Sequence, residues 1–213
     1  MLYSVQQKIE SLLTTIDRLG VVKIKHLLEI HDLKSYANAC RIITKQLRPY
    51  IHETYYQKEK VIYLNKAGRD LIASEKEDIR INEQTIHSLL RNEVFIYFKC
   101  PRDWKNEHPI QTDIMNRNSF GIQFKGISLS NNKKVISDAV FKRNGYLHLI
   151  EVDNERKMLD NKKKIEAYKE VLPAYQDQTP ILYFFTKTEL RKRKLSEWLK
   201  GIRHEIMTYD EIR

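Results

Sequence analysis

The sequence predicts a mixed α/β protein made of two domains, and three features of its pattern support that prediction. Residues 1–76 contain three helical patterns, an apolar strand pair and a closing helix, in that order. Residues 85–213 alternate between helical and strand-like patterns, which is typical of an α/β domain. The stretch between them, residues 77–84, is charged and only weakly periodic, and we interpret it as a linker.

Composition narrows the class of protein before any motif is considered. The chain has 213 residues, of which 41% are hydrophobic and 31% charged, so it can bury a core and is not a disordered chain. Its 38 Lys and Arg against 28 Asp and Glu give a net charge of +10. This excess favours a polyanionic partner, with nucleic acid ahead of a membrane surface, although a basic protein with no such partner would have the same composition.

The cysteines and the N-terminal residues bear on location. Cys40 and Cys100 are too few for a zinc site or a disulfide framework, so we expect free thiols in a reducing cytoplasm. The first residues lack the apolar core of a signal peptide, and no apolar run is long enough to span a bilayer. We therefore expect a cytoplasmic protein with no membrane partner.

The first domain begins with three predicted helices. Residues 4–18 place apolar side chains at helical spacing, and residues 21–32 indicate a short strand followed by a second helix. Residues 35–50 form the third helix, with Ser35 as its N-cap and Pro49 as its end.

A hairpin and a closing helix complete this domain. Residues 50–65 are rich in β-branched and aromatic residues around the polar centre "QKEK", which predicts a hairpin, and residues 65–76 predict a helix. Three short helices followed by a hairpin are the element order of a winged helix-turn-helix, whose third helix fits the DNA major groove. We expect residues 1–76 to fold and bind double-stranded DNA alone. The alternative is a helical module for protein contacts or dimerisation.

The third helix is predicted to have a core face and a DNA-facing side. The core face is predicted to consist of Ala37, Cys40, Ile43 and Leu47. The side chains available to base edges and phosphates are predicted to be Tyr36, Asn38, Arg41 and Lys45, joined by Lys58 and Lys60 from the hairpin.

The second domain is predicted to run helix, hairpin, helix, strand, helix. Its elements are a helix from residue 85 whose end can pass into a strand at 95–98, a hairpin at 136–155, a helix at 155–172, a strand at 179–187, a helix at 189–202 and a short strand or turn at 204–212. The polar residues 101–133 are predicted to be irregular.

The hairpin at 136–155 carries carboxylates among apolar residues. Its "NG" dipeptide, Asn144-Gly145, is the strongest short hairpin signal, and a two-residue loop there places Asp138 opposite Glu151. The two-residue period of a strand puts Asp153 on the same face as Glu151. The sequence therefore predicts a cluster of three acids.

Like charges placed opposite each other in a sheet repel, so something must offset the repulsion. Mg²⁺ held by Asp138 and Glu151 would do so, as would a lysine or a shared proton. On the helix at 155–172, Lys164 and Tyr168 lie on one stripe and could turn toward the acids. The alternative is a solvent-facing strand end where water screens the charges.

Several short motifs resemble the plasmid replication-relaxation family over nearly the whole chain. They are "IHSLLRNEV", "SDAVF", "IEVDNE" and "KIEAY", preceded by the predicted winged helix. The matching positions are His87, Asn92, Asp138, Glu151, Asp153, Lys164 and Tyr168. The resemblance implies a second domain similar to restriction endonucleases, a role in a plasmid or mobile element, and a relaxase or replication initiator as a protein partner. A homodimer is a separate expectation, because helix-turn-helix proteins often need two half-sites.

The resemblance also raises the question of catalysis. An active nuclease of that fold carries an Asp and then Glu-x-Lys, with the acids on a metal and the lysine near the attacking water. Here the sequence is Glu151-Val152-Asp153, so an acid stands at the lysine position unless Lys164, or less favourably Lys157, substitutes from the helix. On this argument Asp153 is an unbalanced charge, and Asp153→Asn is expected to leave stability unchanged or slightly raised.

Three hypotheses follow. The first is a non-catalytic, sequence-specific DNA-binding protein acting in replication, relaxase-dependent transfer or transcriptional control. The second is a metal-dependent endonuclease with Asp138, Glu151, Asp153, Lys164 and Tyr168 as its catalytic residues. The third is an assembly module that dimerises through the second domain.

Overall fold

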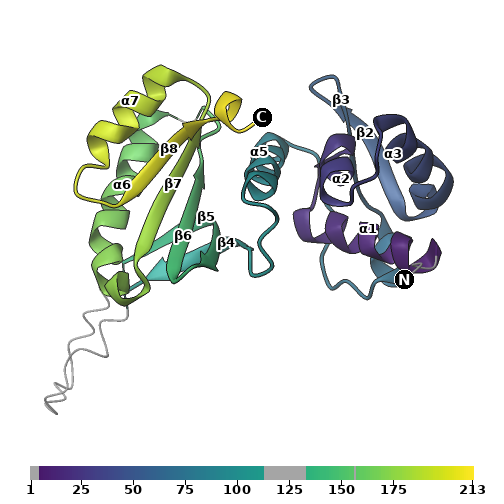
Figure 1. Ribbon diagram of the computed structural model, residues 1–213, viewed down its shortest axis with the longest axis horizontal. Coiled ribbons are helices and arrows are strands. Elements are labelled where there is room, and N and C mark those ends of the chain that lie inside the picture. Colours follow the sequence, from purple (N-terminus) through teal and green to yellow (C-terminus); the bar gives the residue numbers. More distant parts are fainter. Residues whose placement is uncertain (1–4, 113–132, 156) are drawn as a thin grey trace, which may run out of the picture. The chain divides into compact units, whose positions relative to one another are not determined.

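The protein is a mixed α/β structure, as predicted, and its contacts divide it into two compact units (Figure 1). The computed structural model describes residues 5–112, 133–155 and 157–213. The first unit is Met1–Cys100 and the second is Pro101–Arg213. No helix in the described residues has the length and apolar character needed to cross a membrane.

The N-terminal unit contains the predicted helices and hairpin. Its elements are α1 (Val5–Leu19), β1 (Val22–Lys23), α2 (Ile24–Ile30), α3 (Tyr36–Ile42), β2 (Ile51–Tyr56), β3 (Glu59–Leu64), α4 (Lys66–Leu71) and α5 (Gln84–Tyr97). A π-helical turn (Ile43–Leu47) and a 3-10 turn (Arg48–Tyr50) continue α3 without a break. The three strands form one antiparallel sheet in the order β1-β3-β2.

The start of α3 is set by a capping residue, and its core face differs from the predicted one. The Ser35 hydroxyl accepts a hydrogen bond from the backbone N–H of Asn38 at 3.2 Å, as expected of an N-cap. The buried side chains are Ala39, Ile42, Ile43 and Leu47, whereas Ala37 is exposed and Cys40 half-buried. Ala37 lies two residues from Ala39, and two residues turn an α-helix by about 200°, so the two alanines cannot share a face.

Helix α5 belongs to the N-terminal unit, whereas the sequence assigned residues from 85 onward to the second domain. Leu89 of α5 joins Val21 and Val61 in a buried cluster, against which Ile79 and Ile81 pack. The proposed linker at 77–84 therefore contributes apolar side chains to this unit. The expected strand at 95–98 is wrong, because α5 remains helical to Tyr97.

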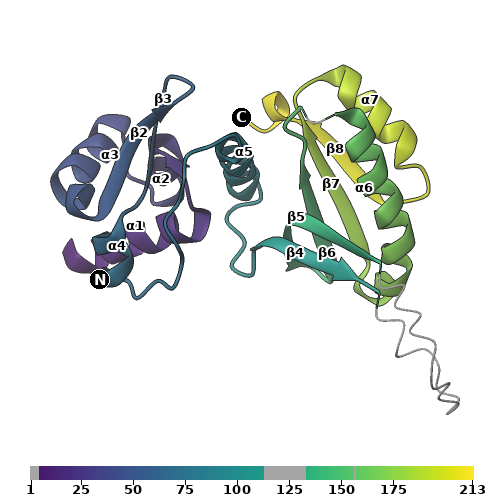
Figure 2. The same ribbon diagram turned by 180° about the vertical axis from the view of Figure 1, so that it is seen from behind.

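The C-terminal unit is a five-stranded sheet with two helices on one face (Figures 1 and 2). Its elements are β4 (Lys105–Gln111), β5 (Lys134–Arg143), β6 (Tyr146–Val152), α6 (Met158–Val171), β7 (Pro180–Thr186), α7 (Glu189–Trp198) and β8 (His204–Thr208). Strands β4, β5 and β6 are antiparallel, and β6, β7 and β8 are parallel. Strand β4 lies in the region that the sequence predicted to be irregular. Its residues alternate in burial, but most of them are polar, so the alternation of apolar and polar residues that indicates a strand is missing.

The core of this unit lies between the sheet and the helices. Its buried members include Val140, Leu149, Leu182, Phe184, Ile165, Tyr168, Leu195 and Leu199. Burying these apolar surfaces holds α6 over β5 and β6, which fixes the side chains of α6 above the predicted acids.

Candidate functional site

The register of the β5–β6 hairpin is the predicted one. Asn144 and Gly145 form the two-residue loop with φ values of 53° and 80°, as a type I′ turn requires. Arg143 pairs with Tyr146, and the pairing continues to Ala139 and Ile150. The next position along the hairpin holds Asp138 and Glu151, and both are buried.

Lys164 joins the two carboxylates from above. Its Nζ lies 2.5 Å from Glu151 Oε2 and 3.3 Å from Asp138 Oδ1. Tyr168, one helical turn later, donates its hydroxyl to Glu151 Oε1 at 2.5 Å. The backbone N–H of Val152 donates to Asp138 Oδ2 at 2.7 Å. We call Asp138, Glu151, Lys164 and Tyr168 the acid–lysine cluster.

Burial governs the protonation of this cluster. Desolvation and the nearby Asp138 carboxylate raise the pKa of Glu151 to about 8, although Lys164 and Tyr168 act in the opposite direction. Burial lowers the pKa of Lys164, but Glu151 and Asp138 outweigh it, so the pKa is raised and the ammonium stays charged. Burial also raises the pKa of Tyr168 well above its usual value, which keeps its hydroxyl a donor. Glu151 can therefore exchange a proton near neutral pH.

Asp153 is held by a different set of partners. Arg191 of α7 donates two hydrogen bonds to it, from Nε at 2.6 Å and from Nη2 at 2.7 Å. Thr186 and Asn161 add bonds of 2.8 and 3.0 Å. The structure thus divides the three acids between two cationic partners, in place of the single cluster predicted. The positive charge of Arg191 balances the Asp153 carboxylate, so the argument that Asp153 adds an unbalanced charge is wrong.

Two of these partners were not found from the sequence. Arg191 lies 38 residues after Asp153, and Thr186 lies 33 residues after it. The only local signal is that Arg191 follows Thr188, whose hydroxyl caps α7.

The other suggested lysine, Lys157, is exposed at the start of α6. Of the remaining motif residues, Asn92 donates to the backbone oxygen of Val21 at 2.8 Å, within the N-terminal unit, and His87 is buried on α5.

The donor set does not fit a divalent cation as it stands. Mg²⁺ takes oxygen ligands, and Asp138 and Glu151 each offer one, but the Lys164 ammonium contacts both of those oxygens. Within the described ranges, no three His, Cys, Asp or Glu side chains are arranged to hold a metal ion. Of the three ways of offsetting the repulsion, the contacts of Lys164 supply one, and the raised pKa of Glu151 favours a second, a proton on that carboxyl group.

The predicted DNA-facing side chains are mostly exposed. Tyr36, Arg41 and Lys45 are exposed, and so are Thr44 and Arg48, which the sequence did not single out. Asn38 is half-buried and is occupied within the protein: its Nδ2 donates to Leu33 O at 3.0 Å, and its Oδ1 accepts from Arg41 Nη2 at 2.9 Å. Asn38 therefore orients Arg41.

The hairpin places its two lysines differently. Lys58 is exposed at the β2–β3 turn, where Gln57 and Lys58 have positive φ. Lys60 forms an ion pair with Glu53 at 2.6 Å, and this bond raises the pKa of Lys60. A cleft of about 350 Å³ separates this hairpin from α3 and is lined by further groups including Lys23, Lys25, Tyr36 and Tyr55.

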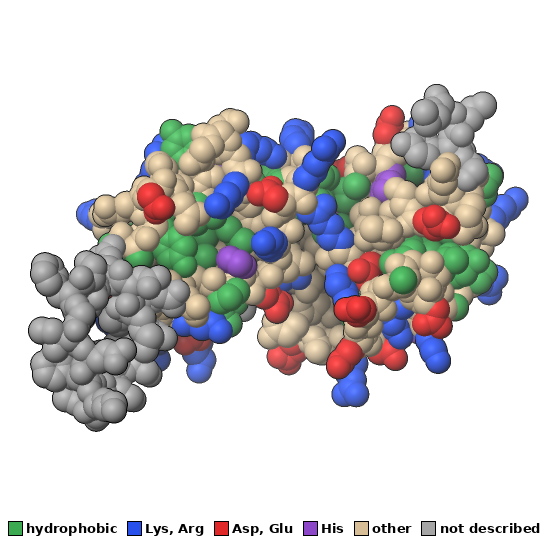
Figure 3. Space-filling model, turned by 90° about the horizontal axis from the view of Figure 1, so that it is seen from below, with side chains coloured by type: hydrophobic (Ala, Val, Ile, Leu, Met, Phe, Trp, Pro, Cys, Tyr) green, Lys and Arg blue, Asp and Glu red, His purple; other side chains and the backbone are tan. Residues whose placement is uncertain are grey.

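Charge is dispersed on the face drawn in Figure 3. Lys and Arg side chains lie over both units with Asp and Glu between them. Local clusters, rather than one continuous basic surface, must therefore supply any strong anion binding on this face.

Comparison with known proteins does not assign a family. No protein-family model matches the sequence, and no curated protein is significantly similar to it. The chain is similar to a solved structure, protein VC1899 from Vibrio cholerae, at 15% identity with a TM-score of 0.39. The similarity covers 100% of this chain and 55% of that one, so the chain spans about half the length of VC1899. A similarity this weak carries no argument about function.

Proposed function

We propose that the chain is a sequence-specific, double-stranded DNA-binding protein of a plasmid or other mobile element, acting in replication, relaxase-dependent transfer or transcriptional control. One observation carries the DNA-binding part: Arg41, Lys45 and Arg48 are exposed on the helix that runs from α3 to Tyr50. Tyr36 and Cys40 of the same helix line a cleft together with residues of the β2–β3 hairpin, which carries the exposed Lys58. The mobile-element part rests on the resemblance to the replication-relaxation family.

The arrangement of the N-terminal unit supports a winged helix-turn-helix. The order α1, β1, α2, α3, β2, β3 and the sheet order β1-β3-β2 suit a recognition helix flanked by a wing. Both cysteines are free, which agrees with a cytoplasmic location. A relaxase or replication initiator as partner stays a prediction of the family resemblance, and a homodimer stays a prediction of the helix-turn-helix reading.

Removing the exposed cations of α3 is expected to weaken DNA binding. Arg41→Ala and Lys45→Ala each delete a charge suited to a phosphate, so each should lower affinity on all sequences and reduce the salt slope of binding by about one. The measurement is fluorescence anisotropy of a labelled, linearised plasmid fragment titrated with the full chain over a range of salt concentrations.

Lys8→Ala, on the exposed part of α1, is the control for loss of one charge. A fragment for the same assay should span residues 1–100, because residues 1–76 lack Leu89 and the flanking Ile79 and Ile81. Unchanged affinity and slope in both α3 variants would show that this helix does not bind DNA.

A second candidate function is endonuclease activity, and the contacts of Lys164 favour it. Its ammonium contacts Asp138 and Glu151, which the resemblance identifies with a nuclease site. Lys164 is therefore placed to replace the strand lysine that this sequence lacks. Against this, Asp138 and Glu151 are only 7% and 3% exposed. A DNA phosphate cannot reach them without rearrangement.

The full chain is therefore expected not to cut DNA. Supercoiled plasmid incubated with the protein and Mg²⁺ or Mn²⁺ should remain supercoiled on an agarose gel. Metal-dependent nicking that is lost in Glu151→Gln and Lys164→Met, but kept in Glu166→Gln, would establish the endonuclease in place of the non-catalytic protein. Glu166 is an exposed residue of the same helix, which makes it a matched control.

A further inference from the structure

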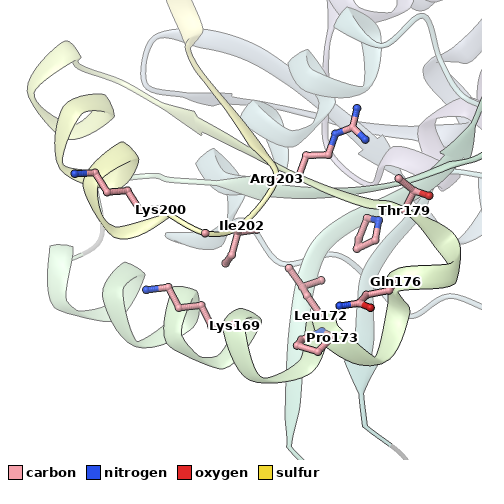
Figure 4. A pocket seen from close by; sticks show the side chains of 10 residues that line it. Lys169, Leu172, Pro173, Gln176, Thr179, Lys200, Ile202 and Arg203 are labelled. Atoms are coloured by element: carbon pink, nitrogen blue, oxygen red, sulfur yellow. The ribbon is translucent and has the colours of Figure 1, made fainter.

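The C-terminal unit carries a second cationic surface, at the opposite end of the sheet from the acid–lysine cluster. It is a cleft of about 450 Å³ where α6 ends, β7 begins and the chain approaches β8. Its lining includes Lys169, Leu172, Gln176, Thr179, Lys200 and Arg203 (Figure 4). We call it the Lys200 cleft. Glu151 and Asp153 lie instead at the carboxyl end of β6.

The charges of the Lys200 cleft are of one sign. Three of its lining residues are cationic and none is an Asp or Glu. Lys200 and Arg203 make no ion pair within the part of the chain that the structure describes. Lys169 pairs at 3.0 Å with Glu166, but Lys169 is only partly buried and Glu166 is exposed, so water competes for that bond. Such a surface selects an anionic ligand.

The remaining polar groups of the cleft suit a ligand that only accepts hydrogen bonds. The side chains of Gln176 and Thr179 have no hydrogen-bond partner among the described residues, so their amide and hydroxyl donors are available. The Arg203 guanidinium lies 4.6 Å from the centre of the Tyr146 ring, which limits its rotamers without neutralising it. Phosphate oxygens are acceptors with no donor of their own, and they match this set of donors.

The directions in which the cationic side chains extend favour a DNA strand over a small anion as the ligand of the cleft. In Figure 4, Lys169 and Lys200 extend to one side of the apolar Leu172 and Ile202, whereas Arg203 and Thr179 lie on the other. One small anion cannot contact groups that diverge in this way. A DNA strand carries a phosphate at every nucleotide and can contact them in succession.

We propose that the Lys200 cleft is a second contact site for the phosphate backbone of DNA, separate from the basic side of α3. This inference rests on the proposed DNA-binding function and extends it to the C-terminal unit. The cleft would add sequence-independent, salt-dependent affinity, because phosphate contacts position a protein on DNA and carry no sequence information.

The test is binding of linearised plasmid DNA by the full chain carrying Lys200→Glu together with Arg203→Glu. The affinity should fall at least tenfold at low salt, and the salt slope should fall by about two because two contacts are lost. The matched control is Lys163→Glu with Lys194→Glu, which makes the same charge change on exposed positions of α6 and α7. It should stay within about threefold of the unaltered chain. Lys200→Glu alone should also weaken binding, and it controls for misfolding because the exposed Lys200 side chain makes no ion pair or hydrogen bond within the described residues.

Three outcomes separate the possibilities. An equal loss in the cleft variant and its control would overturn the inference, since the effect would then be net charge alone. Complete inhibition of DNA binding by millimolar inorganic phosphate at constant ionic strength would also overturn it, because the cleft would then be a site for a small anion. If Arg41→Ala and Lys45→Ala weaken binding but the cleft variants do not, the proposed function stands and this inference fails.

Discussion

Asp153→Asn is expected to destabilise the protein by about 3–5 kcal/mol, the range for removing one partner of a buried ion pair. The Asp153 side chain has no exposed surface and accepts two hydrogen bonds from Arg191. The neutral amide keeps the shape of the carboxylate but turns a donor toward the guanidinium. This is the reverse of the result expected from the sequence. Urea denaturation of the full chain, followed by circular dichroism, measures the loss.

The control is Asp160→Asn, an exposed acid at the start of α6. It should change the free energy of unfolding by less than about 0.5 kcal/mol. A double-mutant cycle with Arg191→Met should show strong coupling, because each single change already breaks the same pair. Additive effects, or an Asp153→Asn variant as stable as the unaltered chain, would contradict the assignment of this pair.

Lys164→Met is the second large change, and its effect should depend on pH. It leaves Asp138 and Glu151 buried without their cation, which should cost about 3 kcal/mol at pH 8. Folding already raises the pKa of Glu151 from 4.5 to about 8, and loss of the ammonium raises it further. A group with a raised pKa takes up a proton on folding, so the free energy of unfolding falls as pH rises through this interval. In the unaltered chain this fall ends near pH 8, where Glu151 ionises in the folded state, whereas in the variant it continues to higher pH. The gap between the two proteins should therefore stay nearly constant from pH 5 to 8 and widen by about 1.4 kcal/mol per pH unit above pH 8.

Urea denaturation at pH 6, 8 and 9.5 makes the comparison. Lys163→Met, at the neighbouring exposed position, should follow the unaltered chain at each pH. Adding Glu151→Gln to Lys164→Met should restore part of the stability at pH 8, since only one buried carboxylate remains. A loss of equal size at all three pH values would show that the lysine acts through packing and not through charge.

The sequence was most informative where a local signal determines geometry. Asn144-Gly145 is sufficient to set the register of β5 and β6, so the opposition of Asp138 and Glu151 could be predicted. Helical spacing was likewise enough to bring Lys164 and Tyr168 over the acids. Both arguments need only the period of an element and the position of one turn.

The features that were missed depend on contacts between elements distant in sequence. The partner of Asp153 is set by how α7 packs on the sheet, and no local pattern encodes that distance. The assignment of α5 to the N-terminal unit follows from contacts of Leu89 and Asn92 with residues near Val21. A periodic apolar stripe shows that a helix is covered, but it does not show by which part of the chain.

One charged network in the N-terminal unit has a consequence for sequence variation. Lys23 contacts Glu59 of the hairpin at 2.5 Å and Glu93 of α5 at 3.4 Å, and Glu93 also contacts Lys25 at 3.5 Å. Each of the two buried charges, Lys23 and Glu93, thus has two partners, whereas the outer charges of Glu59 and Lys25 are partly exposed. Either Glu59 or Lys25 can be replaced by a neutral residue while the ion pair between Lys23 and Glu93 is kept. The inner residues can change only together, so homologues should vary freely at positions 59 and 25 and show linked changes at 23 and 93.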